Sequence, residues 1–274
     1  MIEAITCDLD GTLLDHRARI RPQSARALQF LARQGILVVL ASGRSWRTVL
    51  KIQRLLGISG PIITHNGAYG YDSQSGQEWH RKGIPLARAR QLLTFSDQQH
   101  IMVRCYLGAM HPVVYNRFDL AHQLCWMRAE DRLVPDLAHS LSVEPLEIFL
   151  SGLDSVDRIV SQFGLSGEDY ELVVFPHIGY REVNICAPGV DKVEALESLT
   201  RAYAIRRENV LALGDGANDV RMLEWAGISV AVGDGNDMAK RVAKFVTTPG
   251  NPEPVLEGLQ WSLPHYLSRP LTSA

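Results

Sequence analysis

Short apolar runs alternate with helical patterns in the first third of the chain. Residues 2–7 form a short, mainly apolar run, and residues 36–41 are continuously apolar, which is typical of a strand buried on both faces of a sheet. Between them, residues 22–33 place their apolar side chains on one helical face. This alternation predicts a parallel sheet with right-handed crossovers. The five elements, in β-α-β-α-β order, are predicted over residues 2–7, 22–33, 36–41, 45–56 and 61–64.

The same alternation returns in the last third of the chain, after Pro188 and Gly189. Helices are predicted over residues 192–203, 220–226 and 238–243, and strands over residues 210–213, 229–232 and 245–247. Because both ends of the chain carry this pattern, we expect a single sheet built from the two ends.

The middle of the chain has a different pattern, with shorter strands, half of the aromatic residues and most of the histidines. Strands are predicted over residues 102–107, 113–115, 147–151 and 172–175, and helices over residues 86–99, 119–128 and 155–163. The predicted fold class is therefore α/β. Residues 1–83 and 185–274 form a Rossmann-like parallel sheet core with helices on both faces, and residues 84–184 form an inserted α+β domain.

Composition and charge exclude several classes of protein. Hydrophobic residues make up 46% of the 274 residues and charged residues 21%, which is typical of a globular protein. The net charge of −2 gives no reason to expect nucleic acid or a membrane surface as a partner. There is no apolar stretch of the ~20 residues that span a bilayer, and no signal-peptide pattern. The four cysteines lack metal-site spacing, and we expect a reducing, cytoplasmic location.

Two carboxylates follow the first predicted strand. Asp8 and Asp10 are two residues apart, so in a strand they would point to the same side, at the carboxyl end where open α/β sheets place their active sites. Two carboxylates this close repel each other unless a cation joins them, and oxygen ligands suit Mg²⁺. The alternative is a solvated turn, since Asp and Gly are common in turns.

A second acidic pair, Asp215 and Asp219, follows a later predicted strand in the segment Gly-Asp-Gly-Ala-Asn-Asp. Small residues let the backbone turn sharply while carboxylates converge on a cation. This segment alone could also be a simple turn. Two acidic loops at the carboxyl ends of parallel strands favour one shared metal site.

Three further segments could hold a phosphate. Ser42-Gly43-Arg44 joins a strand to a helix N-terminus, although Ser42 could simply cap that helix. Asn66 lies in a possible tight turn after the third strand. Lys192 begins a predicted helix, where it could balance the carboxylates and hold a phosphoryl oxygen or merely be solvated.

In this order, the motifs Asp8-x-Asp10-Gly-Thr, Ser42-Gly-Arg44, Lys192 and Gly-Asp215-Gly-x-Asn-Asp219 resemble the haloacid dehalogenase (HAD) superfamily. More narrowly, the chain resembles the Cof-type (subclass IIB) phosphatases, whose cap domain is inserted between the second and third motifs.

The resemblance implies a mechanism and a role for each motif residue. Asp8 would attack phosphorus and form an aspartyl-phosphate, Asp10 would act as general acid and base, and Lys192 would complete the catalytic set. The implied ligands of one Mg²⁺ are Asp8, Asp10 through its backbone carbonyl, Asp215 and Asp219, the last either directly or through a water molecule. The implied substrate and phosphate contacts are Ser42, Gly43, Arg44, Asn66 and Asn218.

The resemblance also implies a substrate class: small phosphorylated metabolites such as sugar phosphates, nucleotides or cofactor phosphates. The cap would close over the site, and His177, Tyr180 and Arg181 are expected in a cap loop that could face the substrate or be ordinary loop residues. The alternatives are a phosphotransferase or phosphomutase on the same scaffold, and a non-catalytic sensor of a phosphorylated metabolite. We expect a monomer or homodimer, with no nucleic-acid or membrane partner.

Overall fold

The computed structural model describes residues 1–117, 128–177 and 179–267, and of residues 175–177 and 180 only the backbone. The described chain divides into two compact units. The first comprises Met1–His80 and the chain from Asp191 onward, and the second comprises Arg81–Val190. The helix predicted over residues 119–128 falls almost wholly outside the described residues.

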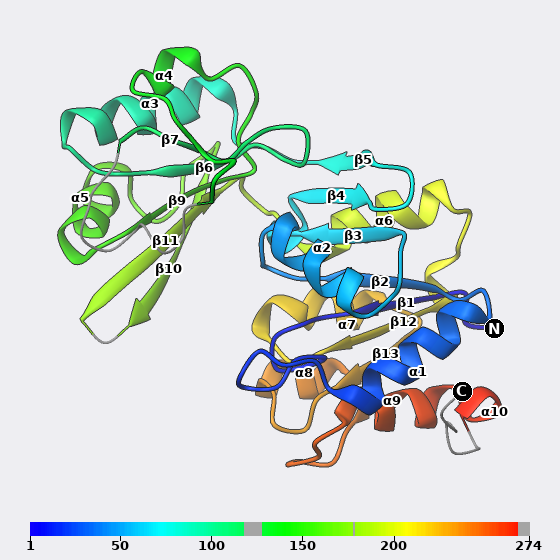
Figure 1. The fold of residues 1–274 in the computed structure, drawn as a ribbon. Coiled ribbons are helices and arrows are strands. Elements are labelled where there is room, and N and C mark those ends of the chain that lie inside the picture. The colour runs from blue at the N-terminus through cyan, green and yellow to red at the C-terminus, as the bar shows by residue number, and fades with distance from the viewer. Residues whose placement is uncertain (118–127, 178, 268–274) are drawn as a thin grey trace. The chain divides into compact units, whose positions relative to one another are not determined.

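The first unit is built on an eight-stranded sheet with the order β14-β13-β12-β1-β2-β3-β4-β5 (Figure 1). Neighbouring strands from β14 to β3 are parallel, and β4 pairs antiparallel with β3. The strands are β1 Ala4–Cys7, β2 Leu37–Ala41, β3 Pro61–Thr64, β4 Tyr69–Asp72, β5 Gln77–Arg81, β12 Val210–Gly214, β13 Ile228–Ala231 and β14 Phe245–Val246.

Helices cover both faces of this sheet. One face packs against α1, α2, α9 and α10 through a cluster that includes Leu28, Val49 and Leu259, and the other packs against α6, α7 and α8 through a cluster that includes Leu196 and Met222. The helices are α1 Pro22–Arg33, α2 Trp46–Leu55, α6 Lys192–Ala202, α7 Val220–Trp225, α8 Asp237–Val242, α9 Pro254–Ser262 and α10 Pro264–Leu267.

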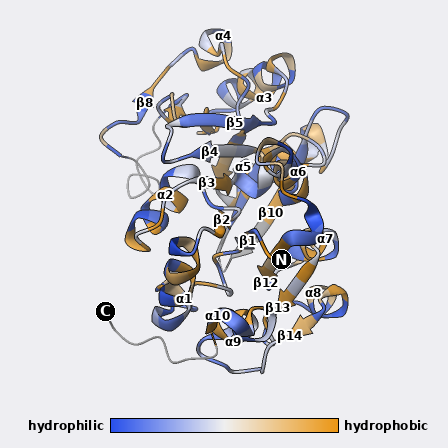
Figure 2. Ribbon diagram, turned by 90° about the vertical axis from the view of Figure 1, so that its right-hand side faces the viewer, coloured by the Kyte–Doolittle hydropathy of each residue, from blue (hydrophilic) through white to orange (hydrophobic). Residues whose placement is uncertain are grey.

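The central strands are apolar because both of their faces are covered. Every residue of β1 and β12 is buried, whereas the edge strand β5 is mostly hydrophilic (Figure 2). The register places Cys7 of β1 beside Leu40 of β2 and Leu213 of β12. The strands β1, β2 and β12 therefore end at the same edge of the sheet, and the polar residues that follow them are brought together.

The second unit has its own six-stranded sheet, with the order β10-β11-β9-β6-β7-β8. Helices α3 and α5 contribute Leu92, Leu93, Val156 and Ile159 to a core that this sheet shares. The elements are α3 Leu86–Gln98, β6 Arg104–Tyr106, β7 Val114–Tyr115, β8 Arg132–Leu133, α4 Leu137–Ser140, β9 Glu147–Ser151, α5 Leu153–Phe163, β10 Glu171–His177 and β11 Tyr180–Cys186.

The predicted fold class is confirmed, and most predicted elements agree with the structure to within one or two residues. One expectation is wrong: His177, Tyr180 and Arg181 do not lie in an open loop. His177 ends β10 and Tyr180 begins β11, and these strands pair residue by residue from Glu171 to Cys186. The side chains of His177 and Tyr180 are outside the described part, and Arg181 pairs with Asp157 of α5 at 2.5 Å.

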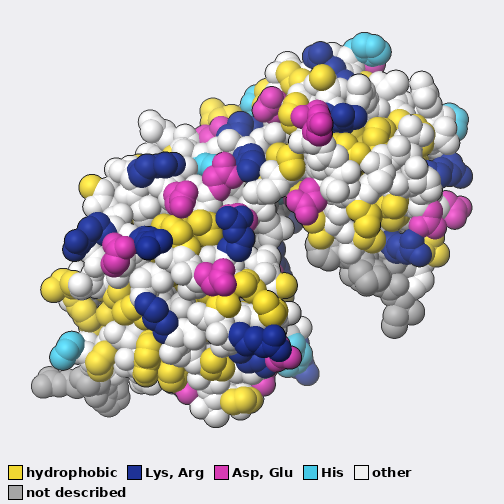
Figure 3. All heavy atoms as spheres, turned by 180° about the vertical axis from the view of Figure 1, so that it is seen from behind, with side chains coloured by type: hydrophobic (Ala, Val, Ile, Leu, Met, Phe, Trp, Pro, Cys, Tyr) yellow, Lys and Arg dark blue, Asp and Glu magenta, His cyan; other side chains and the backbone are white. Residues whose placement is uncertain are grey.

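None of the helices described is long and apolar enough to cross a bilayer. On the face shown in Figure 3, basic and acidic side chains are interspersed over each unit, in keeping with the small net charge.

Candidate active site

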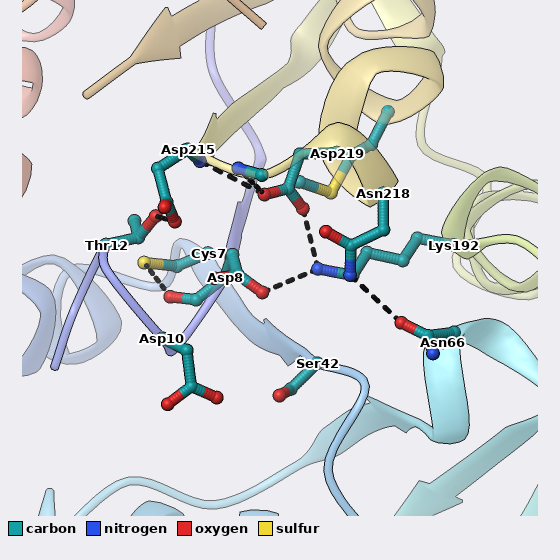
Figure 4. A network of polar contacts seen from close by, with 12 residues as sticks. Cys7, Asp8, Asp10, Thr12, Ser42, Asn66, Lys192, Asp215, Asn218 and Asp219 are labelled. Carbon is teal, nitrogen blue, oxygen red and sulfur yellow. Dashed lines mark hydrogen bonds and ion pairs between the residues drawn. The ribbon is translucent and has the colours of Figure 1, made fainter. Parts of the chain in front are cut away.

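The motif residues of the first unit meet at the carboxyl edge of its parallel sheet (Figure 4). Asp8 follows β1, Ser42 follows β2 and Asp215 follows β12, while Lys192 is the first residue of α6. The amide of Asp8 still donates to the carbonyl of Leu213 at 3.0 Å, so its backbone is held by the neighbouring strand. Strand register alone thus brings together residues more than 200 positions apart.

Lys192 lies between two carboxylates at the centre of the site. Its Nζ donates to Asp8 Oδ1 at 2.6 Å and to Asp219 Oδ1 at 2.6 Å. All three side chains are buried, with exposed fractions of 1%, 7% and 0% for Lys192, Asp8 and Asp219. A single buried cation therefore balances two buried anions, which could not remain unpaired at this depth.

The loop after β12 orients the other acidic residues. Asp219 Oδ2 accepts from the backbone amides of Asp215 at 3.0 Å and Gly216 at 2.9 Å. Asp215 Oδ1 in turn accepts from Thr12 Oγ1 at 2.7 Å. Gly11 has a φ of +79°, and a Cβ built on it would lie 2.3 Å from Asp215 Oδ2. The chain after β1 therefore approaches Asp215 too closely for any side chain at position 11.

Asp10 points away from this cluster and pairs with an arginine. Both carboxylate oxygens of Asp10 accept from Arg44, at 2.7 Å from Nε and 2.5 Å from Nη2. The pair is partly exposed, at 56% for Asp10 and 32% for Arg44. The hydrogen bonds to Asp10 raise the pKa of Arg44, so the guanidinium stays charged.

Two asparagines form a second side of the site. Asn218 Nδ2 donates to Asn66 Oδ1 at 2.9 Å. Asn66 has a φ of +56°, and its side chain packs where a Cβ on Gly43 would lie only 2.7 Å from Asn66 Oδ1. The amide of Asn66 donates to the carbonyl of Ser42 at 3.1 Å. All five predicted substrate or phosphate contacts, Arg44 included, are thus linked to this edge of the sheet.

Burial dominates the electrostatics of the carboxylates. It raises the pKa of Asp8 to about 7, with Lys192 opposing the shift and the charges of Asp219 and Asp215 adding to it. Burial also raises the pKa of Asp215, against the hydrogen bond from Thr12. For Lys192, burial alone would lower the pKa, but the charges of Asp8 and Asp219 outweigh it and raise the pKa.

The acidic cluster fits a divalent cation. Asp8, Asp215 and Asp219 each offer an oxygen, and these oxygens lie within 4.8 Å of one another. Ligands on opposite sides of one Mg²⁺ are about 4.2 Å apart, twice the ~2.1 Å bond, so small movements would suffice. With Asp10, the four carboxylates face two cations, Lys192 and Arg44, which leaves two negative charges for a divalent ion to balance.

Two residues that order the site were not among the predicted site residues. One is Thr12, whose hydroxyl holds Asp215; its place directly after the acidic motif was the available signal. The other is Asp191, which caps α6 by accepting from Val193 N at 2.7 Å and Glu194 N at 3.1 Å. An Asp just before a helical pattern is a usual cap, and here it fixes the turn that carries Lys192.

Comparison with known proteins agrees with this geometry. The profile of a family described as haloacid dehalogenase-like hydrolase matches residues 5–142 and 157–259. The chain belongs to this family. The Bacillus subtilis 5-amino-6-(5-phospho-D-ribitylamino)uracil phosphatase YitU is 26% identical over 264 residues, covering 93% of this chain and 96% of the relative. The Escherichia coli pyridoxal phosphate phosphatase YbhA is 27% identical over 258 residues, covering 88% and 92%.

Solved structures share the fold. A haloacid dehalogenase-like hydrolase from Bacteroides thetaiotaomicron has 25% identity and a TM-score of 0.77, covering 96% of this chain and all of the other. The subclass IIB sugar phosphatase BT4131 has 20% identity and a TM-score of 0.68, covering 96% and 98%, which shows the fold alone. The predicted superfamily and the predicted enzyme class, a phosphatase, are confirmed.

Proposed function

We propose that this HAD-family phosphatase is a Mg²⁺-dependent phosphomonoester hydrolase that works through an aspartyl-phosphate on Asp8. The observation that carries the proposal is the position of Asp8. Its buried carboxylate lies beside one cation, Lys192, and shares a three-carboxylate cluster with Asp215 and Asp219. This is the arrangement expected of a nucleophile that must approach a phosphate dianion.

Asp8 is the nucleophile. One of its oxygens forms a bond to phosphorus while the bond from phosphorus to the leaving oxygen breaks. Lys192 holds a phosphoryl oxygen and offsets the charge that two anions bring together. When bound by Asp8, Asp215 and Asp219 with the carbonyl of Asp10, Mg²⁺ supplies further positive charge against the repulsion between carboxylate and phosphate.

Asp10 carries the protons in both steps. In the first it gives a proton to the leaving alkoxide, and in the second it takes one from the water that attacks the phosphorus of the aspartyl-phosphate. The acid thus regains its proton and Asp8 regains its carboxylate. Ser42, Gly43, Asn66 and Asn218 are the proposed contacts of the phosphoryl group and substrate. Their placement around the carboxyl edge of the sheet supports this role.

The proposed substrates are small phosphorylated metabolites: sugar phosphates, nucleotides or cofactor phosphates. The names of YitU, a 5-amino-6-(5-phospho-D-ribitylamino)uracil phosphatase, and YbhA, a pyridoxal phosphate phosphatase, support this range. We assign selection of the leaving group to the second unit, Arg81–Val190, which has a sheet and core of its own. We propose a cytoplasmic location; in the described part of the chain Cys7, Cys105 and Cys186 are free, as expected in a reducing compartment.

The test is phosphate release from p-nitrophenyl phosphate with Mg²⁺ and with EDTA. Wild type should turn over only with Mg²⁺, and Asp8→Asn should be inactive while keeping a native circular dichroism spectrum. The matched control is Asp136→Asn, which removes an exposed carboxylate at the N-cap position of α4. This variant should keep full activity. Near-normal activity of pure Asp8→Asn would contradict the nucleophile assignment. An added acceptor alcohol that captures the phosphoryl group would instead favour a phosphotransferase.

A further inference from the structure

Arg44 grips the whole carboxylate of Asp10. Its Nε and Nη2 each donate to a different oxygen, at 2.7 and 2.5 Å. The fork of a guanidinium matches a carboxylate in this two-bond arrangement and fixes its direction as well as its charge. Arg44 is one of the predicted substrate or phosphate contacts, and in this structure its side chain bonds Asp10.

Both residues of the pair stand on ordered backbone. The amide of Arg44 donates to Ser42 Oγ at 3.2 Å, and its carbonyl accepts from the amide of His65 at 3.1 Å. On the other side, the amides of Thr12 and Leu14 donate to the carbonyl of Leu9, at 3.3 and 2.7 Å, which closes the turn that carries Asp10. The guanidinium therefore reaches Asp10 from a fixed point and can define where its carboxyl lies.

We propose that Arg44 is the positioning residue of Asp10: it orients the carboxyl and stabilises the carboxylate that remains once Asp10 has given its proton to the leaving oxygen. The proposal rests on the proposed phosphatase function. In that step the O–H bond of Asp10 breaks, the new O–H bond forms on the leaving oxygen, and the negative charge moves to Asp10. Two charge-assisted hydrogen bonds from Arg44 stabilise the negative charge on Asp10.

The exposure of the pair agrees with this role. Arg44 and Asp10 are 32% and 56% exposed, so solvent reaches both side chains and screens their attraction. The ion pairs of Lys192 with Asp8 and Asp219 are buried, so water screens them far less than it screens the pair of Arg44 and Asp10. The two cations of the site thus have different proposed roles: Lys192 contacts the nucleophile Asp8 and the phosphoryl group, and Arg44 positions the acid and base Asp10.

The experiment compares kcat/KM across a series of ring-substituted phenyl phosphates. These substrates keep nearly the same shape, while the acidity of the departing phenol varies from p-nitrophenol to phenol. A good leaving group needs little proton donation and a poor one needs much. Arg44→Ala should therefore lose about 10-fold or more on phenyl phosphate beyond its loss on p-nitrophenyl phosphate, which steepens the leaving-group dependence toward that of Asp10→Asn.

Four controls separate this role from others. In the Asp10→Asn background, Arg44→Ala should have little further effect on the slope, because the group it positions is gone. The inhibition constant of inorganic phosphate should be nearly unchanged in Arg44→Ala. Arg54→Ala removes the same charge from the exposed end of α2 and should match wild type throughout. Arg44→Lys keeps the charge but not the two-bond geometry. Its leaving-group dependence should therefore lie between those of wild type and Arg44→Ala.

The outcomes are distinct. A uniform loss on all phenyl phosphates, with weaker inhibition by phosphate, would make Arg44 a phosphate clamp and overturn the proposal. An unchanged slope and rate in Arg44→Ala would overturn it as well. If wild type released phosphate from none of these esters, the proposed function itself would fail, and the inference with it.

Discussion

Lys192 and Asp8 form a buried ion pair, with 2.6 Å between Nζ and Oδ1 and both side chains less than a tenth exposed. The pair joins the first turn of α6 to the end of β1, which are 184 residues apart in the chain. Because Lys192 also bonds Asp219, it holds together two loops that carry like charges. Folding and the proposed chemistry therefore depend on the same ammonium group.

Replacing Lys192 by methionine should remove activity and lower the free energy of unfolding. The side chain keeps nearly the same volume, but Asp8 and Asp219 lose their cation, and breaking a buried pair costs about 3–5 kcal/mol. Urea unfolding of the metal-free protein measures this. Lys240→Met, at a partly exposed i,i+3 pair with Asp237, should change stability by less than about 1 kcal/mol. Equal losses in the two variants would contradict the account.

The stability of metal-free Asp8→Asn relative to metal-free wild type should increase as the pH rises from about 4 to about 7. Burial raises the pKa of Asp8 from 3.8 to about 7, so the folded protein holds this proton more strongly than the unfolded chain. Stability from protonated Asp8 is complete below pH 4, falls as the pH rises, and is lost above 7. Thermal unfolding with EDTA across this range measures the difference between variant and wild type. A pH-independent difference would contradict the pKa shift.

Gly11→Ala should weaken Mg²⁺ binding through Asp215. The added Cβ would lie 2.3 Å from Asp215 Oδ2, so the carboxylate must move. Gly35→Ala is the matched control, because Gly35 also has a positive φ, +86°, but nothing lies within 4 Å of its added Cβ. Both variants should lose stability from backbone strain, while only Gly11→Ala should need more Mg²⁺ for half-maximal activity. The same Mg²⁺ requirement in both would mean that strain, and not displacement of Asp215, is responsible.

Mg²⁺ should raise the melting temperature of wild type and much less that of Asp215→Asn. A ligand that binds only the folded state at 100 times its Kd stabilises it by about 2.7 kcal/mol. Thr12→Val should show a smaller Mg²⁺ effect than wild type, since Asp215 Oδ1 loses the hydroxyl that orients it at 2.7 Å. Differential scanning fluorimetry measures all three proteins, with Asp136→Asn as the control. An equal Mg²⁺ shift in Asp215→Asn would remove Asp215 from the ligand set.

Apolar runs allowed the parallel core to be predicted, because strands covered on both faces must be apolar. The predicted and observed bounds of Pro22–Arg33 and Pro61–Thr64 are identical. The strand Gln77–Arg81 escaped prediction because it lies at the sheet edge and is polar and at least partly exposed, and the four-residue strand Tyr69–Asp72 because glycine and aspartate interrupt its apolar pattern. Helix Pro254–Ser262 was hidden by its Pro and Gly; Gly258 is needed because its backbone packs closely against Val230.

The residues of the candidate site could be predicted from the sequence, but the contacts between their side chains could not. Carboxylates after parallel strands imply convergence at one sheet edge, and Asp8, Asp215 and Asp219 do converge. The partner of Arg44 could not be read from the sequence, because a guanidinium suits a phosphate as well as a carboxylate. Only the distance between the loops that carry Arg44 and Asp10 settles which partner it contacts in this structure.

The most direct test of the central claim is a search for phosphate on Asp8 itself. The protein is mixed with p-nitrophenyl phosphate and Mg²⁺, quenched in acid during turnover, digested and analysed by mass spectrometry. The account predicts that the peptide containing Asp8 gains the mass of one phosphoryl group in wild type and gains none in Asp8→Asn. Turnover with no phosphorylated Asp8 at any quench time, together with activity retained by Asp8→Asn, would contradict it.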